Sequence, residues 1–218
     1  MKGRDMTRLD RATYTLTRGV IVVIGTLFFR VKVEGRENLP AAGACVVAPV
    51  HRSNLDTPIL AFVTPRRLRF MGKDSLWKSK LGRYLTALGG FPVVRGTADR
   101  DALRACQAIL DRGEPLVMFP EGTRRTGPRV EDLFDGPAFL AARTGAPIIP
   151  VGVGGTEGIL PRGAKFPRFK TVTIVIGAPI VPPPPDGRVP RRVIRELTEQ
   201  LQIELQKAFD ITKTRSPS

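Results

Sequence analysis

Short apolar runs alternate with segments of helical spacing along most of this chain. This alternation constrains the fold most, because strands separated by helices pair into a mainly parallel sheet with helices on its faces. The predicted strands are residues 45–50, 68–71, 91–94, 115–119, 147–151 and 171–176. The predicted helices that separate and follow them are residues 80–88, 98–112, 137–143 and 190–209. We therefore expect an α/β fold with a mixed, mostly parallel sheet flanked by helices.

The length of 218 residues suits one domain with a sizeable core. Four consecutive prolines, Pro182 to Pro185, form a stiff connector that is neither helix nor central strand. We find no internal repeat and no second domain. The expected organisation is an N-terminal helical segment, residues 1–30, followed by one α/β domain, residues 31–218.

The charge balance predicts an anionic partner. The 35 Lys and Arg residues against 20 Asp and Glu give a formal net charge of +15, which suits nucleic acid, an anionic lipid surface or a phosphorylated substrate. The two cysteines, Cys45 and Cys106, cannot build a disulfide scaffold. With only His51 beside them they cannot form a four-ligand zinc site either, so we expect no metal.

The N-terminal segment carries the longest uncharged apolar run, residues 19–29 between Arg18 and Arg30. This run is too short to span a bilayer, and no small-residue cleavage site follows it as in a signal peptide. We expect a helix over residues 5–29 that lies in the membrane interface, although packing on the protein's own core is an alternative. The residues expected to contact anionic headgroups are Lys2, Arg4, Arg8, Arg11 and Arg18, and those expected to enter the acyl boundary are Leu16, Val20, Val23, Ile24 and Leu27.

His51 is the only imidazole in the chain, so a general base of that kind must be His51. Asp56 follows five positions later, a spacing that separates two side chains by about 140° on a helix. The two can meet if the segment between them is a turn, which Ser53 and Asn54 favour, and Thr57 and Pro58 after it are typical of a helix start. A carboxylate on one ring nitrogen would then leave the other nitrogen as a base. The alternative is a capping Asp56 beside a surface histidine.

The chain offers no convincing internal nucleophile for such a base to activate. None of its five serines lies in a G-x-S-x-G sequence, and Cys45 and Cys106 fall in apolar segments that disfavour a thiolate. A His–Asp pair without a nucleophile would deprotonate a substrate hydroxyl directly.

Two further segments could bind an anionic substrate. In the sequence FPEGTRR, residues 119–125, Gly122 permits close approach to the backbone, Thr123 supplies a hydroxyl, and Arg124 can grip a phosphate. In the sequence GGFPVVRG, residues 89–96, Arg95 ends a strand. Either arginine could instead be a solvated surface charge. The basic cluster over residues 66–83, which includes Lys73, is interpreted as a solvated face.

Together these segments resemble the glycerolipid acyltransferase family, which includes the 1-acylglycerol-3-phosphate acyltransferases. The family's H-x4-D motif is matched by His51 and Asp56, its glycine-rich block by residues 89–95, its F-P-E-G-T-R motif by residues 119–124 and its V-P-V-like strand by residues 149–151. The resemblance covers roughly residues 31–180. One departure is Val50, where the family often has Asn before the histidine.

The resemblance implies transfer of a fatty acyl group from acyl-CoA or acyl carrier protein to a hydroxyl of 1-acyl-glycerol 3-phosphate, giving phosphatidic acid in phospholipid biosynthesis. His51 would be the base and Asp56 its partner. The implied substrate-binding residues are Lys73, Arg95 and Arg124 on the phosphate, Glu121 on a glycerol hydroxyl or an arginine, and Gly122 and Thr123 beside them. The implied partners are a lyso-phospholipid acceptor, the acyl donor and an anionic membrane, at whose cytoplasmic face the protein would be peripheral or monotopic. No cofactor is implied beyond the donor as co-substrate.

Three alternatives remain at this stage. The same motifs would serve an acyltransferase for another acceptor, such as glycerol 3-phosphate or a glycolipid. A nucleic-acid-binding module would explain the charge, but aromatic residues make up only 6% and no RRM-like stacking motif is visible. We therefore expect no nucleic-acid partner. A non-enzymatic membrane-surface protein would leave the His51–Asp56 pair without a purpose.

Overall fold

The protein is built around a seven-stranded sheet with the order β1-β7-β6-β2-β5-β3-β4. The computed structural model describes residues 6–79, 81–93, 99–159, 166–184 and 187–215. Strands β6, β2, β5, β3 and β4 run parallel to one another, whereas β7 is antiparallel to β6 and β1 is parallel to β7. The expected mixed, mostly parallel sheet in a single domain is therefore confirmed.

The strands are β1 (Lys32–Glu34), β2 (Cys45–Pro49), β3 (Arg69–Lys73), β4 (Gly90–Val93), β5 (Pro115–Val117), β6 (Ile148–Gly154) and β7 (Thr173–Ile176). The helices are α1 (Arg8–Phe29), α2 (Asp56–Ile59), α3 (Leu81–Ala87), α4 (Asp99–Leu110), α5 (Gly136–Thr144), α6 (Thr156–Ile159) and α7 (Arg191–Arg215). The six predicted strands and the predicted helices are present with ends shifted by a few residues. The predicted ends at residues 5, 80, 94 and 98 lie outside the described residues.

Sequence analysis missed β1 and α6, which are three and four residues long and too short to show a period. It indicated a helix start at Thr57 and Pro58, inside α2, but gave no helix range there. It also ended the last helix too early. The amphipathic stripe continues past residue 209 because Thr212 is fully buried against Gly154.

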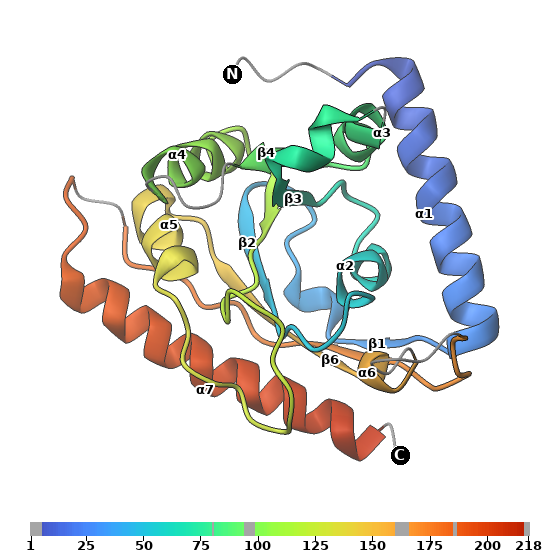
Figure 1. Cartoon of the computed structure of the whole chain (residues 1–218). Helices are drawn as coiled ribbons and strands as arrows, with labels where there is room; N and C mark the ends of the chain where they lie inside the picture. Colours follow the sequence, from blue (N-terminus) through green and yellow to red (C-terminus); the bar gives the residue numbers. More distant parts are fainter. Residues whose placement is uncertain (1–5, 80, 94–98, 160–165, 185–186, 216–218) are drawn as a thin grey trace.

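Helices cover both faces of the sheet. In Figure 1, α4, α5 and α7 lie on one face, and α1 and α2 lie on the other. The central strands β2 and β6 are buried along their whole length, as expected for strands covered on both sides. Helix α7 approaches β6 closely because Gly152 has no side chain, since a Cβ there would lie 2.4 Å from the Ala208 backbone.

Helix α1 lies along the side of the domain and buries only one face. Thr7 and Asp10 form a capping box at its start, and Tyr14 Oη donates to the Arg66 carbonyl over 2.9 Å. Near its other end, Gly25 is buried against the ring of Phe62. One face of the helix is thus packed on the protein, as the second of the two sequence interpretations proposed.

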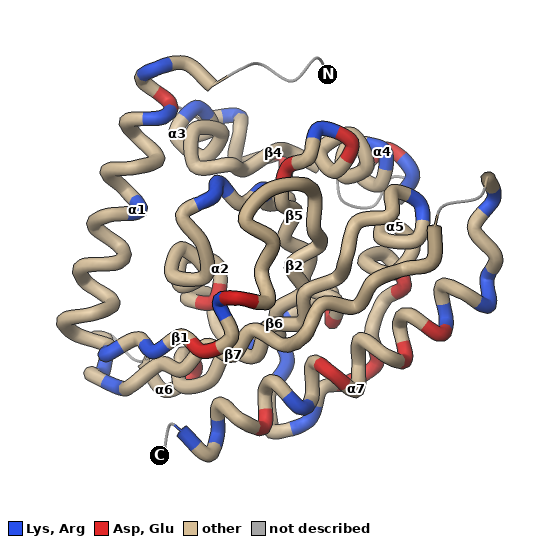
Figure 2. The backbone as a smooth tube through the Cα atoms, turned by 180° about the vertical axis from the view of Figure 1, so that it is seen from behind, with Lys and Arg blue, Asp and Glu red and all other residues tan. Residues whose placement is uncertain are grey.

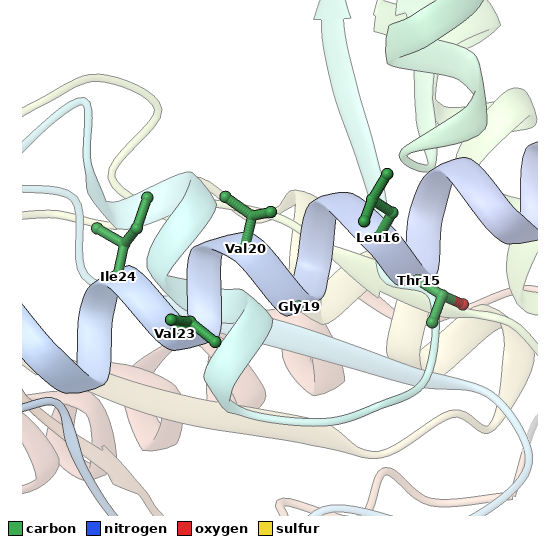
Figure 3. A pocket seen from close by; sticks show the side chains of 6 residues that line it. All are labelled: Thr15, Leu16, Gly19, Val20, Val23 and Ile24. Atoms are coloured by element: carbon green, nitrogen blue, oxygen red, sulfur yellow. The ribbon is translucent and has the colours of Figure 1, made fainter.

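The opposite face of α1 is apolar and exposed. The residues that the sequence placed in a lipid boundary are between 43% and 72% exposed, and they are Leu16, Val20, Val23, Ile24 and Leu27. Figure 3 shows Leu16, Val20 and Ile24 along one side of the helix. Together with Thr15, Gly19 and Val23 they line a shallow apolar depression. By length and composition, α1 would suffice to cross a bilayer, which the shorter uncharged run at residues 19–29 does not.

Candidate active site

The site residues gather at one edge of the sheet. Because β2, β5, β3 and β6 are parallel, their carboxyl ends meet at the same edge. His51 follows β2, Lys73 ends β3, Glu121 follows β5 and Thr156 begins the helix after β6. The topology thus brings together side chains that are up to 105 positions apart in sequence, from His51 to Thr156.

His51 and Asp56 form a hydrogen-bonded pair. His51 Nδ1 lies 3.0 Å from Asp56 Oδ2. The intervening segment is a turn, in which the Asp56 N–H donates to the Ser53 carbonyl over 3.3 Å before α2 begins. The sequence interpretation required this turn, and the structure contains it. The imidazole also stacks on Phe119, with ring centroids 4.1 Å apart, and its side chain is 18% exposed.

The carboxylate of Asp56 is fully buried and accepts four hydrogen bonds. Oδ2 accepts from His51 and from the backbone N–H groups of Arg52 and Ser53 at 2.6 and 2.7 Å, and Oδ1 accepts from Thr156 Oγ1 at 2.6 Å. Because a carboxylate only accepts, His51 Nδ1 is the donor of their hydrogen bond. The remaining ring nitrogen, Nε2, then carries the lone pair that can take a proton.

A buried ion pair lies beneath the histidine. Arg52 Nη1 lies 2.8 and 2.7 Å from the two carboxylate oxygens of Glu121, and Glu121 Oε2 also accepts the His51 backbone N–H over 3.1 Å. Arg52 further donates to the carbonyls of His51 and Arg129, and its guanidinium lies 4.9 Å from the Phe209 ring centroid. Glu121 is fully buried. Of the two roles that sequence analysis gave it, this geometry is that of orienting an arginine.

Gly122 shapes the loop after Glu121. Its φ of +68° is in the left-handed region, and a Cβ there would lie 2.4 Å from the ring of Phe134. The Phe134 N–H donates to the Pro120 carbonyl over 2.9 Å, which holds the ring over the glycine. The glycine thus serves the loop geometry, and its backbone is exposed.

The remaining predicted residues lie on the open side of this edge. Lys73, Thr123 and Arg124 are exposed, Lys73 at the end of β3 and the other two in the loop after β5. Arg95 follows β4 in sequence but lies outside the described residues.

Sequence analysis missed Arg52 and Thr156. Arg52 stands inside the H-x4-D segment, where the sequence gave no sign that its charge is buried against Glu121. Thr156 lies 100 positions from the carboxylate to which it donates, and only the parallel pairing of β2 with β6 brings it there.

The interpretation of residues 66–83 as a solvated face is wrong for three arginines. Arg66 donates to the carbonyls of Pro40 and Gly113, Arg67 donates to Thr86, and Arg69 lies 3.3 Å from Glu114. These partly buried side chains tie loops of the domain together. Arg66 and Arg67 were misread because backbone carbonyl acceptors leave no trace in a sequence, and Arg69 because its partner Glu114 lies 45 positions away.

Neither cysteine has the environment of a nucleophile. Burial raises the pKa of Cys45 to about 11 and that of Cys106 to about 12, so neither thiol forms a thiolate near neutral pH. Within the described ranges, no group of three or more His, Cys, Asp or Glu side chains could hold a metal ion.

Comparison with known proteins points to one family. The family model described as Acyltransferase matches residues 30–154, more than half of the chain. A chloroplastic 1-acyl-sn-glycerol-3-phosphate acyltransferase of Brassica napus is 29% identical over 158 residues, covering 70% of this chain and 46% of the relative. An enzyme of the same name from Bacillus subtilis is 29% identical over 171 residues, covering 77% and 82%.

Among solved structures, the crystal structure of the 1-acyl-sn-glycerophosphate acyltransferase of Thermotoga maritima matches with a TM-score of 0.72. The match covers 95% of this chain and 84% of that chain at 24% sequence identity, so it bears on the fold alone. This chain spans slightly less than half the length of the plant relatives that it matches.

Proposed function

This chain belongs to the acyltransferase family, and from that premise we propose that it transfers a fatty acyl group from an acyl thioester to the hydroxyl of 1-acyl-glycerol 3-phosphate, giving phosphatidic acid. The observation that carries the proposal is the His51–Asp56 pair, 3.0 Å apart at the carboxyl edge of the sheet. The acceptor is suggested by the names of the relatives from Brassica napus and Bacillus subtilis. The proposed catalytic domain is residues 31–218, and residues 1–30 are the proposed membrane-associating segment.

In the proposed mechanism, His51 Nε2 removes the proton of the acceptor hydroxyl as its oxygen attacks the thioester carbon. Asp56 holds the imidazole in the required tautomer and stabilises the imidazolium that forms. The tetrahedral intermediate then collapses, the carbon–sulfur bond breaks, and the imidazolium returns the proton to the leaving thiolate. The products are the new ester and a free thiol. The donor, acyl-CoA or acyl carrier protein, brings the activated acyl group with it, so the proposal assigns the reaction no further cofactor.

Basic side chains at the same edge are proposed to bind the acceptor phosphate. Lys73 ends β3, Arg124 lies in the loop after β5 and Arg95 follows β4 in sequence. Charge-assisted hydrogen bonds to phosphate are among the stronger polar contacts in proteins, and a guanidinium can make two at once. Thr123 and the exposed backbone at Gly122 lie beside Arg124, where they can contact the same group.

Glu121 and Arg52 are proposed to act through His51 instead of on the substrate. Glu121 accepts the backbone N–H of His51, and Arg52 donates to the backbone carbonyl of the same residue. The ion pair therefore fixes both the N–H and the carbonyl of His51. This matters because a small displacement of a general base from the proton that it removes lowers the reaction rate strongly. Both are positioning residues in this account.

The proposed location is the cytoplasmic face of a membrane, with the protein held peripherally by the exposed apolar face of α1. Helix α1 exposes a row of apolar side chains. Figure 2 shows basic positions, in blue, near both ends of this helix. Apolar insertion together with attraction to anionic lipid is the usual basis of interfacial binding.

The test is an acyl-transfer assay of the purified full chain, with palmitoyl-CoA and oleoyl-CoA as donors. The acceptors are 1-oleoyl-glycerol 3-phosphate, glycerol 3-phosphate, lysophosphatidylcholine and monooleoylglycerol, and products are identified by mass spectrometry. We expect phosphatidic acid to form with the highest kcat/KM, and monooleoylglycerol, which has no phosphate, to be poor. A higher kcat/KM with another acceptor would reassign the substrate, and equal use of monooleoylglycerol would contradict the phosphate contacts.

A further inference from the structure

A short segment outside the active site exposes two aromatic side chains. Phe166 is 81% exposed and Phe169 is 73% exposed, three positions apart. Arg168 and Lys170 lie between and beside them and are exposed as well. Isolated exposed apolar residues are common on soluble proteins, but large aromatic side chains gathered on one surface indicate a contact with a partner.

This segment, residues 166–170, is fixed against the C-terminal end of α1. The ring of Phe169 stacks on that of Phe28, with centroids 5.7 Å apart and an interplanar angle of 27°. The Arg168 N–H donates to the Ile159 carbonyl over 2.7 Å, and just after the segment the Val172 N–H donates to the Phe29 carbonyl over 3.0 Å. Phe28 is itself 49% exposed, so the aromatic surface is continuous with the apolar face of α1.

The sheet topology places this surface at the same edge as the active site. Strand β7 runs antiparallel to β6, so its first residue, Thr173, pairs with Gly154 at the carboxyl end of β6. Lys32, at the start of β1, pairs with the same Thr173, which brings the end of α1 to this edge. Figure 1 shows the end of α1 beside β1 and α6. Helix α6 begins with Thr156, the donor to the catalytic carboxylate.

The chemistry of this surface fits a bilayer with anionic headgroups. Aromatic side chains favour the membrane–water interface, where the ring enters the acyl boundary. Basic side chains close to the surface add attraction to anionic lipid. Residues 166–170 contain two aromatic side chains, Phe166 and Phe169, and two basic ones, Arg168 and Lys170. Arg30 and Lys32 add two more exposed cations at the end of α1.

We propose that residues 166–170, stacked on the C-terminal end of α1, form a second membrane contact that docks on anionic lipid and holds the catalytic edge of the sheet at the headgroup layer. The proposal rests on the membrane location given under the proposed function. It adds that α1 is not the whole docking surface. A segment about 140 positions further along the chain, whose Phe169 stacks on Phe28, would also fix the orientation of the domain on the membrane.

The experiment measures binding of the full chain to vesicles of phosphatidylcholine, with and without phosphatidylglycerol, by sedimentation. The aromatic variant is Phe166→Ala with Phe169→Ala, and the charge variant is Arg168→Gln with Lys170→Gln. The matched control is Ile203→Ala, an apolar side chain of α7 that is 56% exposed. Unfolding midpoints establish that each variant is folded.

The aromatic variant is expected to bind both kinds of vesicle about tenfold more weakly than the unsubstituted chain. The charge variant is expected to lose about tenfold on anionic vesicles and little on neutral ones. The control should bind as the unsubstituted chain does, and turnover with a short-chain, monomeric acceptor should remain near its original level in all three variants. In the Phe166→Trp variant, brominated lipid should quench a larger share of the tryptophan fluorescence than in the unsubstituted chain, where Trp77 is the only tryptophan.

Unchanged vesicle binding by both double variants would overturn this contact while leaving α1 as the anchor. An effect of the charge variant alone, with the aromatic variant binding both kinds of vesicle as the unsubstituted chain does, would overturn the contact assigned to Phe166 and Phe169. Failure of the unsubstituted chain to bind any vesicle would overturn the membrane location as well, whereas the acyl-transfer assay decides the reaction independently.

Discussion

Replacing the buried carboxylate of Glu121 by an amide tests whether the ion pair beneath the histidine acts as described. Glu121→Gln removes the negative charge that faces Arg52 at 2.7 Å with both side chains at most 2% exposed. Breaking a buried pair by removing one partner costs about 3–5 kcal/mol. We expect the lower end, about 3 kcal/mol, because Gln keeps one acceptor oxygen and Arg52 keeps its carbonyl partners.

For a chain of this length, that loss corresponds to a fall in Tm of about 6–12 °C. Because the lost contacts also hold the backbone of His51, kcat should fall by about 10–100-fold at a temperature where the variant is still folded. Thermal unfolding and steady-state acyl transfer measure the two effects separately.

The matched control is Glu131→Gln, which breaks the exposed pair between Glu131 and Arg125 at 2.9 Å. We expect it to change the free energy of unfolding by less than about 1 kcal/mol. A double-mutant cycle that combines Glu121→Gln with Arg52→Met should show strong coupling, because the second substitution removes the charge that the first leaves unpaired. If the two losses simply add, or if Glu121→Gln behaves like the exposed control, the ion pair does not position the histidine.

Three further predictions follow from single residues. Gly122→Ala should cost about 1–2 kcal/mol of stability because its φ is +68°, and a Tm unchanged from that of the original chain would contradict this. Thr156→Val should lower kcat while changing the KM of either substrate little, since the Thr156 hydroxyl donates to the carboxylate that orients the base. If Thr156 is only structural, steady-state kinetics of the folded variant will show an unchanged kcat. Cys45 and Cys106 should resist iodoacetamide at pH 8 in the folded protein and react in denaturant, because burial raises their pKa to about 11 and about 12; rapid labelling of the folded chain, read by mass spectrometry, would refute their burial.

The raised pKa values of the two thiols also determine how the stability of the fold changes with pH. Each thiol ionises at a lower pH in the unfolded chain than in the fold, so the unfolded state binds fewer protons above the ordinary thiol pKa. Stability contributed by Cys45 and Cys106 is therefore complete below that pKa and is lost as the pH rises toward about 11 and about 12.

The order of strands and helices could be predicted because each main strand is a continuous apolar run and each long helix has an apolar stripe. The extent of helix α2 could not be predicted, because its four residues are too few to show a helical period. The antiparallel pairing of β7 with β6 could not be predicted either, since the run TVTIVI suits a parallel or an antiparallel strand equally well.

The His51–Asp56 contact could be anticipated because both residues lie in one short loop. The contacts that complete the site could not, because they join segments far apart in the sequence. Thr156 reaches Asp56 through the pairing of β6 with β2. Arg52 reads as another surface cation in a chain that carries 35 of them, and only its burial against Glu121 distinguishes it.

Helix α1 packs on the protein with one face and still leaves room for the membrane interpretation on the other. The apolar run predicted either lipid contact or packing on the core. In the structure one face packs on the protein, with Gly25 buried against Phe62, and the other face is apolar and exposed, with Leu16 and Leu27 about 70% exposed. Lipid contact by the exposed face is the proposal made above.

The most direct test of the central claim is the turnover number of His51→Gln in acyl transfer from oleoyl-CoA to 1-oleoyl-glycerol 3-phosphate, measured with both substrates saturating. Gln keeps a polar side chain of similar size but offers no ring nitrogen that can take a proton. We predict that kcat falls by about 10²–10⁴-fold, the range for a lost general base, while the unfolding midpoint changes little. A variant that keeps the original kcat would contradict the account, because the chain contains no other histidine.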